Sequence, residues 1–207
     1  MREAANIEAL SGLKPDYMGL IFYPGSKRFV SDADISVLKT FPESIKITGV
    51  FVNEERDIVL QTVKQYHLKA VQLHGNESPE YCRSLGVALS PANIKIELIK
   101  AFGVDEDFDF NDLEAYSDVV DFFLFDTKTP AHGGSGVKFN WDVLKRYPFQ
   151  KPYFLSGGIG PDDMNELMLI NDERFYAADL NSKFEITPGM KDIDELRRAM
   201  ATLRATL

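Results

Sequence analysis

Residues Val119–Thr127 read Val-Val-Asp-Phe-Phe-Leu-Phe-Asp-Thr and form the most apolar strand-like run of this 207-residue chain. A strand with so few polar positions is typical of a parallel sheet covered by helices, because neither of its faces meets water. The run leads into Asp126, so that carboxyl group is expected at the carboxyl end of a strand, at the edge of an apolar core. A carboxyl group in this position is a candidate general acid. A helix cap or a loop ion pair is an equally good interpretation of Asp126 from position alone.

Six further runs are short, apolar and rich in β-branched or aromatic residues, and helical stretches lie between the strand-like runs. The strand-like runs are Tyr17–Phe22, Ile45–Val52, Ala70–Leu73, Ile94–Ala101, Val119–Phe125, Tyr153–Leu155 and Phe175–Ala178. The helical stretches are Ala4–Ser11, Asp32–Phe41, Glu54–Tyr66, a stretch from Pro79, Phe108–Tyr116, Trp141–Tyr147, Pro161–Leu169 and Ile193–Leu203. This alternation predicts a parallel α/β fold in one domain, residues 1–207. Glycine-rich turns late in the chain, with no G-x-G-x-x-G after an early strand, favour a TIM (β/α)8 barrel over an open sheet.

The order of the elements predicts that one strand is absent. A (β/α)8 barrel has eight strands, each before its helix, whereas here the first element is the helix Ala4–Ser11 and only seven strand-like runs follow. We therefore expect strand one of the barrel to be missing, through a misassigned start at Met1 or a natural loss. The two flanking strands would then have unpaired edges, which favour homodimerisation or aggregation.

Composition excludes several classes of function. The net charge is −9, from 23 basic and 32 acidic residues, which argues against nucleic-acid or anionic-membrane partners. The single cysteine, Cys82, allows no intrachain disulfide and fits a reducing cytoplasm. No apolar run has the length of a membrane span, and no Cys/His cluster has metal-ligand spacing.

Three loops carry residues that suit phosphate binding. Gly133–Gly136 follows the strand of Asp126, although a bare glycine run such as this is more typical of a flexible loop. Ser156–Ile159 and Asp179–Ser182 follow the last two strands. The loops after strands seven and eight form the recurrent phosphate site of TIM barrels, and the numbering fits here if strand one is missing.

Two other segments could contact a polar substrate. Gln72 and His74 end a short strand, so their side chains are expected at the mouth of the barrel, although a lone histidine is more often structural. Arg28 lies in an aromatic and glycine-containing loop and could bind a carboxylate or phosphate bidentately, although a solvated loop is as good an interpretation.

Together these segments resemble the phosphoribosylanthranilate isomerase family, the barrel enzymes of tryptophan biosynthesis. The matching segments run in the family's order and are Gly19–Val30, Gly49–Asn53, Val71–Glu77, Phe125–Thr127, Gly133–Gly136, Phe139–Trp141, Ser156–Gly158 and Asn181–Asp192. The resemblance implies a cofactor-free Amadori rearrangement of N-(5-phosphoribosyl)anthranilate to 1-(2-carboxyphenylamino)-1-deoxyribulose 5-phosphate.

The resemblance also assigns roles to individual residues. Asp126 would be the general acid and Arg28 would lie near the anthranilate carboxylate, while Gln72, His74 and Asp179 would bind substrate. Backbone amides near the phosphate would come from Gly134, Gly136, Gly157, Gly158, Asn181 and Ser182.

The chain departs from the family pattern at its beginning. The family opens with a strand ending Lys-Ile-Cys-Gly, whose cysteine is the general base, and Met1-Arg2 match only the two positions after it. Cys82 is no substitute by position, so we expect little turnover. A second departure is Lys183, where the family usually has glycine.

Two other functions remain open. The first is a non-catalytic phosphosugar-binding barrel. The second is a sister enzyme, either indole-glycerol-phosphate synthase or a histidine-pathway isomerase, against which Gly19–Val30 and Gln72–Gly75 argue.

Overall fold

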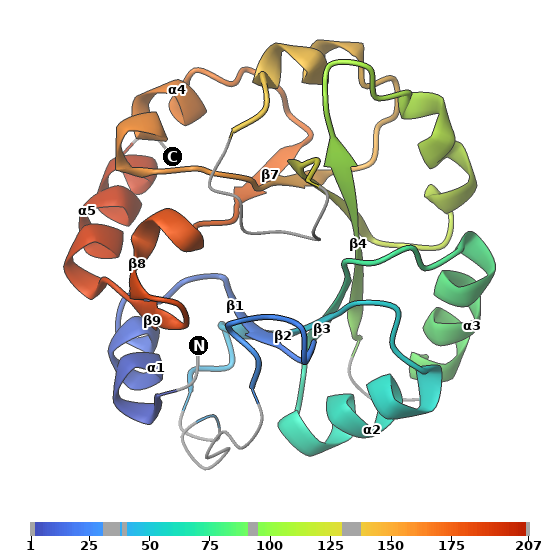
Figure 1. Cartoon of the computed structure of the whole chain (residues 1–207), viewed down its shortest axis with the longest axis horizontal. Coiled ribbons are helices and arrows are strands. Elements are labelled where there is room, and N and C mark those ends of the chain that lie inside the picture. The colour runs from blue at the N-terminus through green and yellow to red at the C-terminus, as the bar shows by residue number, and fades with distance from the viewer. Residues whose placement is uncertain (1–2, 31–37, 39–40, 91–94, 130–137, 206–207) are drawn as a thin grey trace.

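The main element is a sheet of seven parallel strands that pair in chain order from β1 to β7. It is seen in a computed structural model that describes residues 3–30, 38, 41–90, 95–129 and 138–205. Figure 1 shows the sheet curled, with helices around its outside. The strands are β1 (Tyr17–Ile21), β2 (Lys46–Phe51), β3 (Ala70–Leu73), β4 (Glu97–Val104), β5 (Phe122–Thr127), β6 (Tyr153–Leu155) and β7 (Phe175–Ala178). The expected α/β fold with a parallel sheet is confirmed.

Helical segments connect the strands, and the chain adds a short hairpin near its end. The α-helices are α1 (Ala4–Ser11), α2 (Arg56–Tyr66), α3 (Pro79–Leu89), α4 (Met164–Met168) and α5 (Ile193–Arg204). The 3₁₀ segments are η2 (Phe110–Tyr116), η3 (Trp141–Arg146), η4 (Pro161–Asp163) and η5 (Ser182–Phe184), and the antiparallel hairpin is β8 (Glu185–Thr187) with β9 (Met190–Lys191). The predicted helix Asp32–Phe41 lies outside the described residues, except at Leu38 and Phe41. Within the described ranges, no helix is both long and apolar enough to cross a bilayer.

Ser78, Asn140 and Asp192 are residues of cap-forming types that cap the helical segments after them, whereas Asn53, of the same kind, does not cap α2. Ser78, Asn140 and Asp192 each accept a backbone N–H of the first turn that follows. Asn53 does not cap α2, which begins later, at Arg56. Its backbone is left-handed, with φ of 51°, and its side chain accepts from the Asn76 amide instead.

Side chains of the sheet alternate between two apolar clusters. The inner cluster, enclosed by the curled sheet, has Ala70, Ile99, Ala101, Leu124 and Phe154 at its centre. The outer cluster includes Phe123 and Phe125 of β5 and packs the sheet against the helices. Because successive residues of a strand point to opposite faces, Asp126 lies on the inner face, two residues beyond Leu124.

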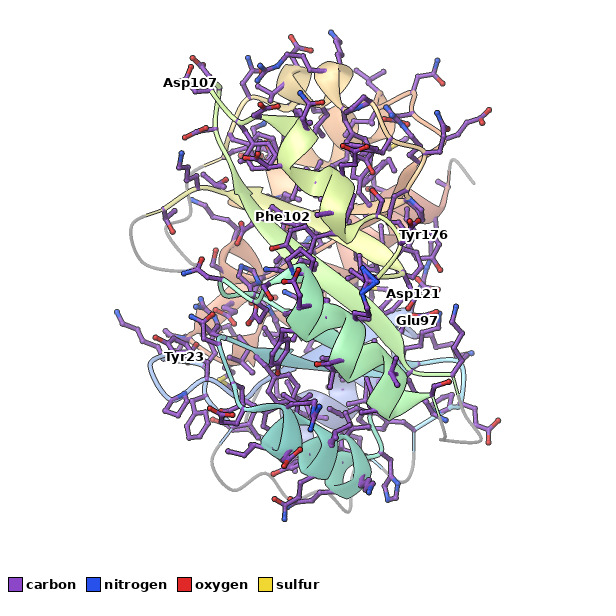
Figure 2. The ribbon with its side chains drawn as sticks, turned by 90° about the vertical axis from the view of Figure 1, so that its right-hand side faces the viewer. Tyr23, Glu97, Phe102, Asp107, Asp121 and Tyr176 are labelled. Carbon is purple, nitrogen blue, oxygen red and sulfur yellow. The ribbon has the colours of Figure 1, made fainter. Side chains whose placement is uncertain are left out.

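The amino ends of the strands are filled by a polar and aromatic group. The Tyr17 hydroxyl donates to Glu97 at 2.8 Å, and Lys46 Nζ lies 2.7 Å from the same carboxylate. Figure 2 shows Glu97, Asp121 and Tyr176 at this end of the strands and Tyr23 at the opposite end. The residues expected to bind ligand therefore lie at the end away from this group.

Side chains connect the first and last parts of the chain. Strands β1 and β7 end the sheet, and within the part of the chain that is described no strand pairing joins them. The Asn6 side chain of α1 donates to Lys191 O at 2.9 Å and accepts from Lys191 N at 2.8 Å. Asn6 thereby satisfies both backbone groups of a buried residue in β9.

We expect Asn6→Ala to lower the free energy of unfolding by about 2–4 kcal/mol, because it leaves two buried backbone groups without partners. Urea denaturation would measure the loss. The exposed Asn171 gives the matched control, Asn171→Ala, which should change stability by less than about 0.5 kcal/mol. Equal effects of the two substitutions would contradict this assignment.

Candidate functional site

Asp126 forms the end of a hydrogen-bonded row at the carboxyl ends of β3 and β5. Its Oδ1 accepts from the Thr127 amide at 2.8 Å, and its Oδ2 lies 3.1 Å from His74 Nε2. His74 Nδ1 lies 2.7 Å from Gln72 Nε2. With the Gln72 amide nitrogen donating, Nδ1 is the acceptor, so the ring proton sits on Nε2 and is donated to Asp126. Three residues singled out in the sequence thus form one row.

A cavity of about 440 Å³ opens beside this row. His74 and Asp126 line it together with Lys100, Phe102 and Tyr116. The volume falls within the range of small-molecule sites, about 300–1,000 Å³. Within the described residues, no group of three or more His, Cys, Asp or Glu side chains could hold a metal ion.

Gly157 lies directly against Asp126. Its φ is +92°, which favours glycine. A Cβ at this position would lie 2.3 Å from Thr127 Oγ1 and 2.8 Å from Asp126 Oδ1. The loop after β6 can therefore approach the acid only because residue 157 has no side chain.

Asp179 adds a second carboxyl group to the same mouth. It follows β7, and its Oδ2 accepts from Ser156 Oγ at 3.2 Å. Burial raises the pKa of Asp179, and the nearby Asp126 carboxylate adds to the rise, while Lys191 opposes it. The two carboxyl groups are thus close enough to affect each other electrostatically.

Arg28 is held by Glu185. Its Nε and Nη2 both donate to the Glu185 carboxylate, with Nη2–Oε2 at 2.6 Å, and only 3% of the Glu185 side chain is exposed. Lys191 Nζ lies 3.5 Å from Glu185 Oε1 and donates to Asn181 Oδ1 at 2.8 Å. Burial lowers the pKa of Lys191, and Glu185 and Asp179 oppose that effect. These side chains link the loop after β1 to the segment that follows β7.

Two of the three predicted phosphate loops, those after β6 and β7, lie side by side. Gly157 and Gly158 both have positive φ, and a Cβ on Gly160 would lie 3.6 Å from the Lys183 Cβ. Asn181 precedes η5, which begins at Ser182. Gly134 and Gly136, also predicted to bind phosphate, lie outside the described residues.

Cys82 has no place in this site. It lies in α3, is fully buried in the outer cluster, and has a pKa raised to about 11 by burial. Neither Lys191 nor Lys100 is among the site residues predicted from the sequence. The available signal was the position of Lys100 as the only charge in the stretch Leu98–Val104, because a charge in such a stretch needs a buried partner.

We expect Gly157→Ala to destabilise the fold by at least about 1 kcal/mol, because it combines a left-handed backbone with a steric clash. Gly86→Ala is the matched control, since a Cβ on Gly86 in α3 would meet nothing within 4 Å. That control should stabilise the helix by up to about 1 kcal/mol. The same sign for both variants in urea denaturation would refute the close approach of Gly157.

Asp179→Asn should gain stability relative to the unchanged chain as the pH rises above about 4. A raised pKa in the folded state stabilises the fold below the unfolded pKa, and this contribution is lost as the pH rises through the folded pKa. Asp172→Asn is the control of opposite sign, because hydrogen bonds from Arg174 lower the pKa of Asp172. Its relative stability should fall as the pH rises to about 4 and stay level above that, because the contribution of a lowered pKa is lost only as the pH falls through the folded pKa. Melting temperatures from about pH 2 to 8 would test both, and differences that do not vary with pH would contradict them.

Known proteins match this chain over nearly its whole length. The family model for N-(5'-phosphoribosyl)anthranilate (PRA) isomerase matches residues 1–202. The N-(5'-phosphoribosyl)anthranilate isomerase of Parabacteroides distasonis is 41% identical over 199 residues, which are 95% of this chain and 87% of that relative. The crystal structure of phosphoribosyl anthranilate isomerase from Thermotoga maritima has a TM-score of 0.82 and 32% identity, covering 99% of this chain and 96% of that one. A phosphoribosyl anthranilate isomerase in complex with reduced 1-(o-carboxyphenylamino)-1-deoxyribulose 5-phosphate has a TM-score of 0.81 and 28% identity, covering 99% and 95%. The chain belongs to the N-(5'-phosphoribosyl)anthranilate isomerase family.

Proposed function

We propose that this chain is a phosphoribosylanthranilate isomerase, which converts N-(5'-phosphoribosyl)anthranilate to 1-(2-carboxyphenylamino)-1-deoxyribulose 5-phosphate without a cofactor. The observation that carries the proposal is the Gln72–His74–Asp126 row beside a cavity, in a chain of this family. The glycines and polar residues after β6 and β7 support a phosphate site on the same end of the strands.

Asp126 is the proposed general acid. Opening the ribose ring requires a proton on the ring oxygen, which otherwise leaves as an alkoxide. Asp126 is 8% exposed and lines the cavity, so its carboxyl group is both reachable by a ligand and largely shielded from water. Proton transfer to the ring oxygen would leave an open-chain Schiff base, whose C2 proton is then acidic enough to be removed.

Gln72 and His74 are proposed to keep Asp126 hydrogen-bonded both before and after it gives up its proton. In the present arrangement the Asp126 carboxylate accepts from His74 Nε2–H. Turning the Gln72 amide by 180° would present its oxygen to Nδ1–H, and His74 Nε2 could then accept from a protonated Asp126. The row therefore has one hydrogen-bonded state for each protonation state of Asp126.

Arg28 is proposed to bind the anthranilate carboxylate. Its Nε and Nη2 are bound to Glu185, and Nη1, which has no hydrogen bond to another described residue, is proposed to donate to the ligand. Asp179, Asn181 and Ser182 would contact the sugar and phosphate. Backbone amides of Gly157 and Gly158, together with those of Gly134 and Gly136, would complete the phosphate site.

The base that removes the C2 proton is proposed to come from an eighth strand. The resemblance implies a cysteine at the end of such a strand, and Cys82 is buried on the outer side of the sheet with a raised pKa. The space between β1 and β7, which the described residues bridge only through side chains, is the proposed place for that strand. We expect slow turnover by the chain alone.

Anthranilate fluorescence, with the product consumed by a coupled synthase, would test these proposals together. The chain would be compared with a form extended ahead of Met1 by a strand ending Lys-Ile-Cys-Gly, and with the same form carrying serine for that cysteine. Fast turnover by the cysteine form alone supports the isomerase and the added strand. Turnover by the unextended chain at the same rate would refute the need for the added base. Product binding without turnover in every form would favour the alternative, a non-catalytic phosphosugar-binding barrel.

We expect Asp126→Asn to lower kcat by about 10²–10⁴-fold, because it removes the general acid. The comparison uses the active form, meaning whichever form, unextended or extended by the cysteine strand, turns over fastest. Product binding should persist. Asp121→Asn is the matched control at the other end of the same run of sequence, where Asp121 pairs with Lys95 and faces away from the cavity end (Figure 2). A control loss as large as that of Asp126→Asn would contradict the assignment.

The proposed setting is the cytoplasm, supported by a single free thiol. The proposed partner is a second copy of the chain, joined through the open edges of β1 and β7. Size-exclusion chromatography would test this: the added strand should reduce association if the edges cause it.

A further inference from the structure

An ion pair that the proposed chemistry does not use lies just behind His74. Lys100 Nζ and Glu77 Oε2 are 3.1 Å apart, and their side chains are 2% and 1% exposed. Among the ion pairs of the described residues, this one is the most buried. Burial lowers the pKa of Lys100, and the Glu77 charge opposes that effect. Burying two charges costs more free energy than burying apolar side chains of similar volume. The pair is therefore a candidate for a role other than stabilising the fold.

Lys100 donates its hydrogen bonds to backbone carbonyl groups at the end of β3 and in β4. Its Nζ donates to Gly75 O at 2.8 Å, to Ala101 O at 2.9 Å and to Leu73 O at 3.4 Å, besides contacting Glu77. An ammonium group has three protons, so these acceptors use all of them. Lys100 therefore lines the cavity without a donor to spare for a ligand.

Glu77 holds the same turn from the other side. Its Oε1 accepts from Asn53 N at 2.8 Å, and its Oε2 accepts from Gly75 N at 3.0 Å. The carboxylate thus joins the turn after β2 to the turn after β3. Charge-assisted hydrogen bonds of this kind are stronger than neutral ones.

His74 lies between the backbone groups that the pair binds. Leu73 O precedes it, Gly75 N and O follow it, and His74 N itself donates to Phe51 O at 2.8 Å. The turn also has little room to move. A Cβ on Gly75 would lie 2.5 Å from Asn53 Oδ1, the atom that accepts from Asn76 N.

We propose that Lys100 and Glu77 are positioning residues that fix the backbone on both sides of His74 and so hold its ring against Asp126. The proposal rests on the proposed function, because it concerns the same acid. The pair does not touch the reacting atoms. Its effect is on the placement of His74 Nε2, and a misplacement of about 1 Å can cost a factor of about 100 in rate.

The test replaces both charges together, as Glu77→Gln with Lys100→Met. Single replacements would leave one buried charge without its partner and would mainly unfold the chain. The control is Glu97→Gln with Lys46→Met, a pair of the same type, 2.7 Å apart at the amino ends of the strands.

Two readouts separate positioning from stability. The first is the tautomer of His74 from ¹⁵N NMR of the imidazole nitrogens, assigned among the three histidines with His74→Asn. We expect the single Nε2–H form to be replaced by a mixture in the Glu77/Lys100 variant and retained in the control. The second is turnover in the active form. We expect kcat to fall about tenfold or more with KM within about twofold, because the contacts proposed for Arg28, Asn181 and Ser182 do not involve this pair.

An unchanged His74 tautomer together with an unchanged kcat would overturn the proposal, and so would equal changes in the control. If no form of the chain turns over, the proposed function fails, and the tautomer alone decides the positioning role. If the double variant does not fold, Glu77→Asp retains the charge but shortens its reach. That variant should still alter the His74 spectrum, and an unaltered spectrum would overturn the proposal.

Discussion

Seven parallel strands can present their carboxyl ends to one ligand only if the two edges of the curled sheet keep their positions, and within the described residues side chains connect the segments at those edges. At the amino end the rings of Tyr17 and Tyr176 lie 6.3 Å apart, and at the mouth Arg28 binds Glu185. Asn6 joins α1 to β9 beside them. Backbone pairing would connect the two edges of the sheet through many hydrogen bonds. Among the described residues, the connection depends instead on a few specific side chains. The shape of the mouth therefore depends on those same contacts.

The charged side chains at the carboxyl ends of the strands form a connected series that begins with the Arg28–Glu185 contact. Glu185 binds both Arg28 and Lys191, and Lys191 and Asp126 both act on the pKa of Asp179, which Lys191 lowers and Asp126 raises. Each carboxyl group has a cation or a hydrogen-bond donor within reach, so several charges are buried together without being left unpaired. The contacts between the two ends of the sheet and the ionisation of Asp179 are for this reason coupled. A change at the Arg28–Glu185 contact would act on Asp179 through Lys191, without direct contact between Arg28 and Asp179.

The sequence predicted the alternation of elements well, because apolar strands and cap residues are local signals. It was less accurate where contacts between distant segments determine the first residue of an element or the partner of a side chain. The run Val119–Phe125 becomes β5 at Phe122–Thr127, which begins after Asp121, a residue whose side chain pairs with Lys95 and accepts from the Leu98 amide. Asn53 comes just before the predicted helix Glu54–Tyr66 and is of a type favoured at helix caps, but its side chain accepts from the Asn76 amide instead. Gln72, His74 and Asp126 were found because strand ends are readable in sequence. Glu77 lies in the loop after β3 and Lys100 lies in β4, and nothing local in the sequence shows that they meet.

Cys82 has a practical consequence for work on this chain. It is the single thiol of the sequence, it is fully buried, and its pKa is raised to about 11. Thiolate is the form that alkylating reagents attack, so the native cysteine reacts slowly in the folded state. A cysteine introduced at any exposed position would be labelled selectively, without first removing the native one. Spin labels or fluorophores placed on either side of the β1–β7 gap could then report its width in solution.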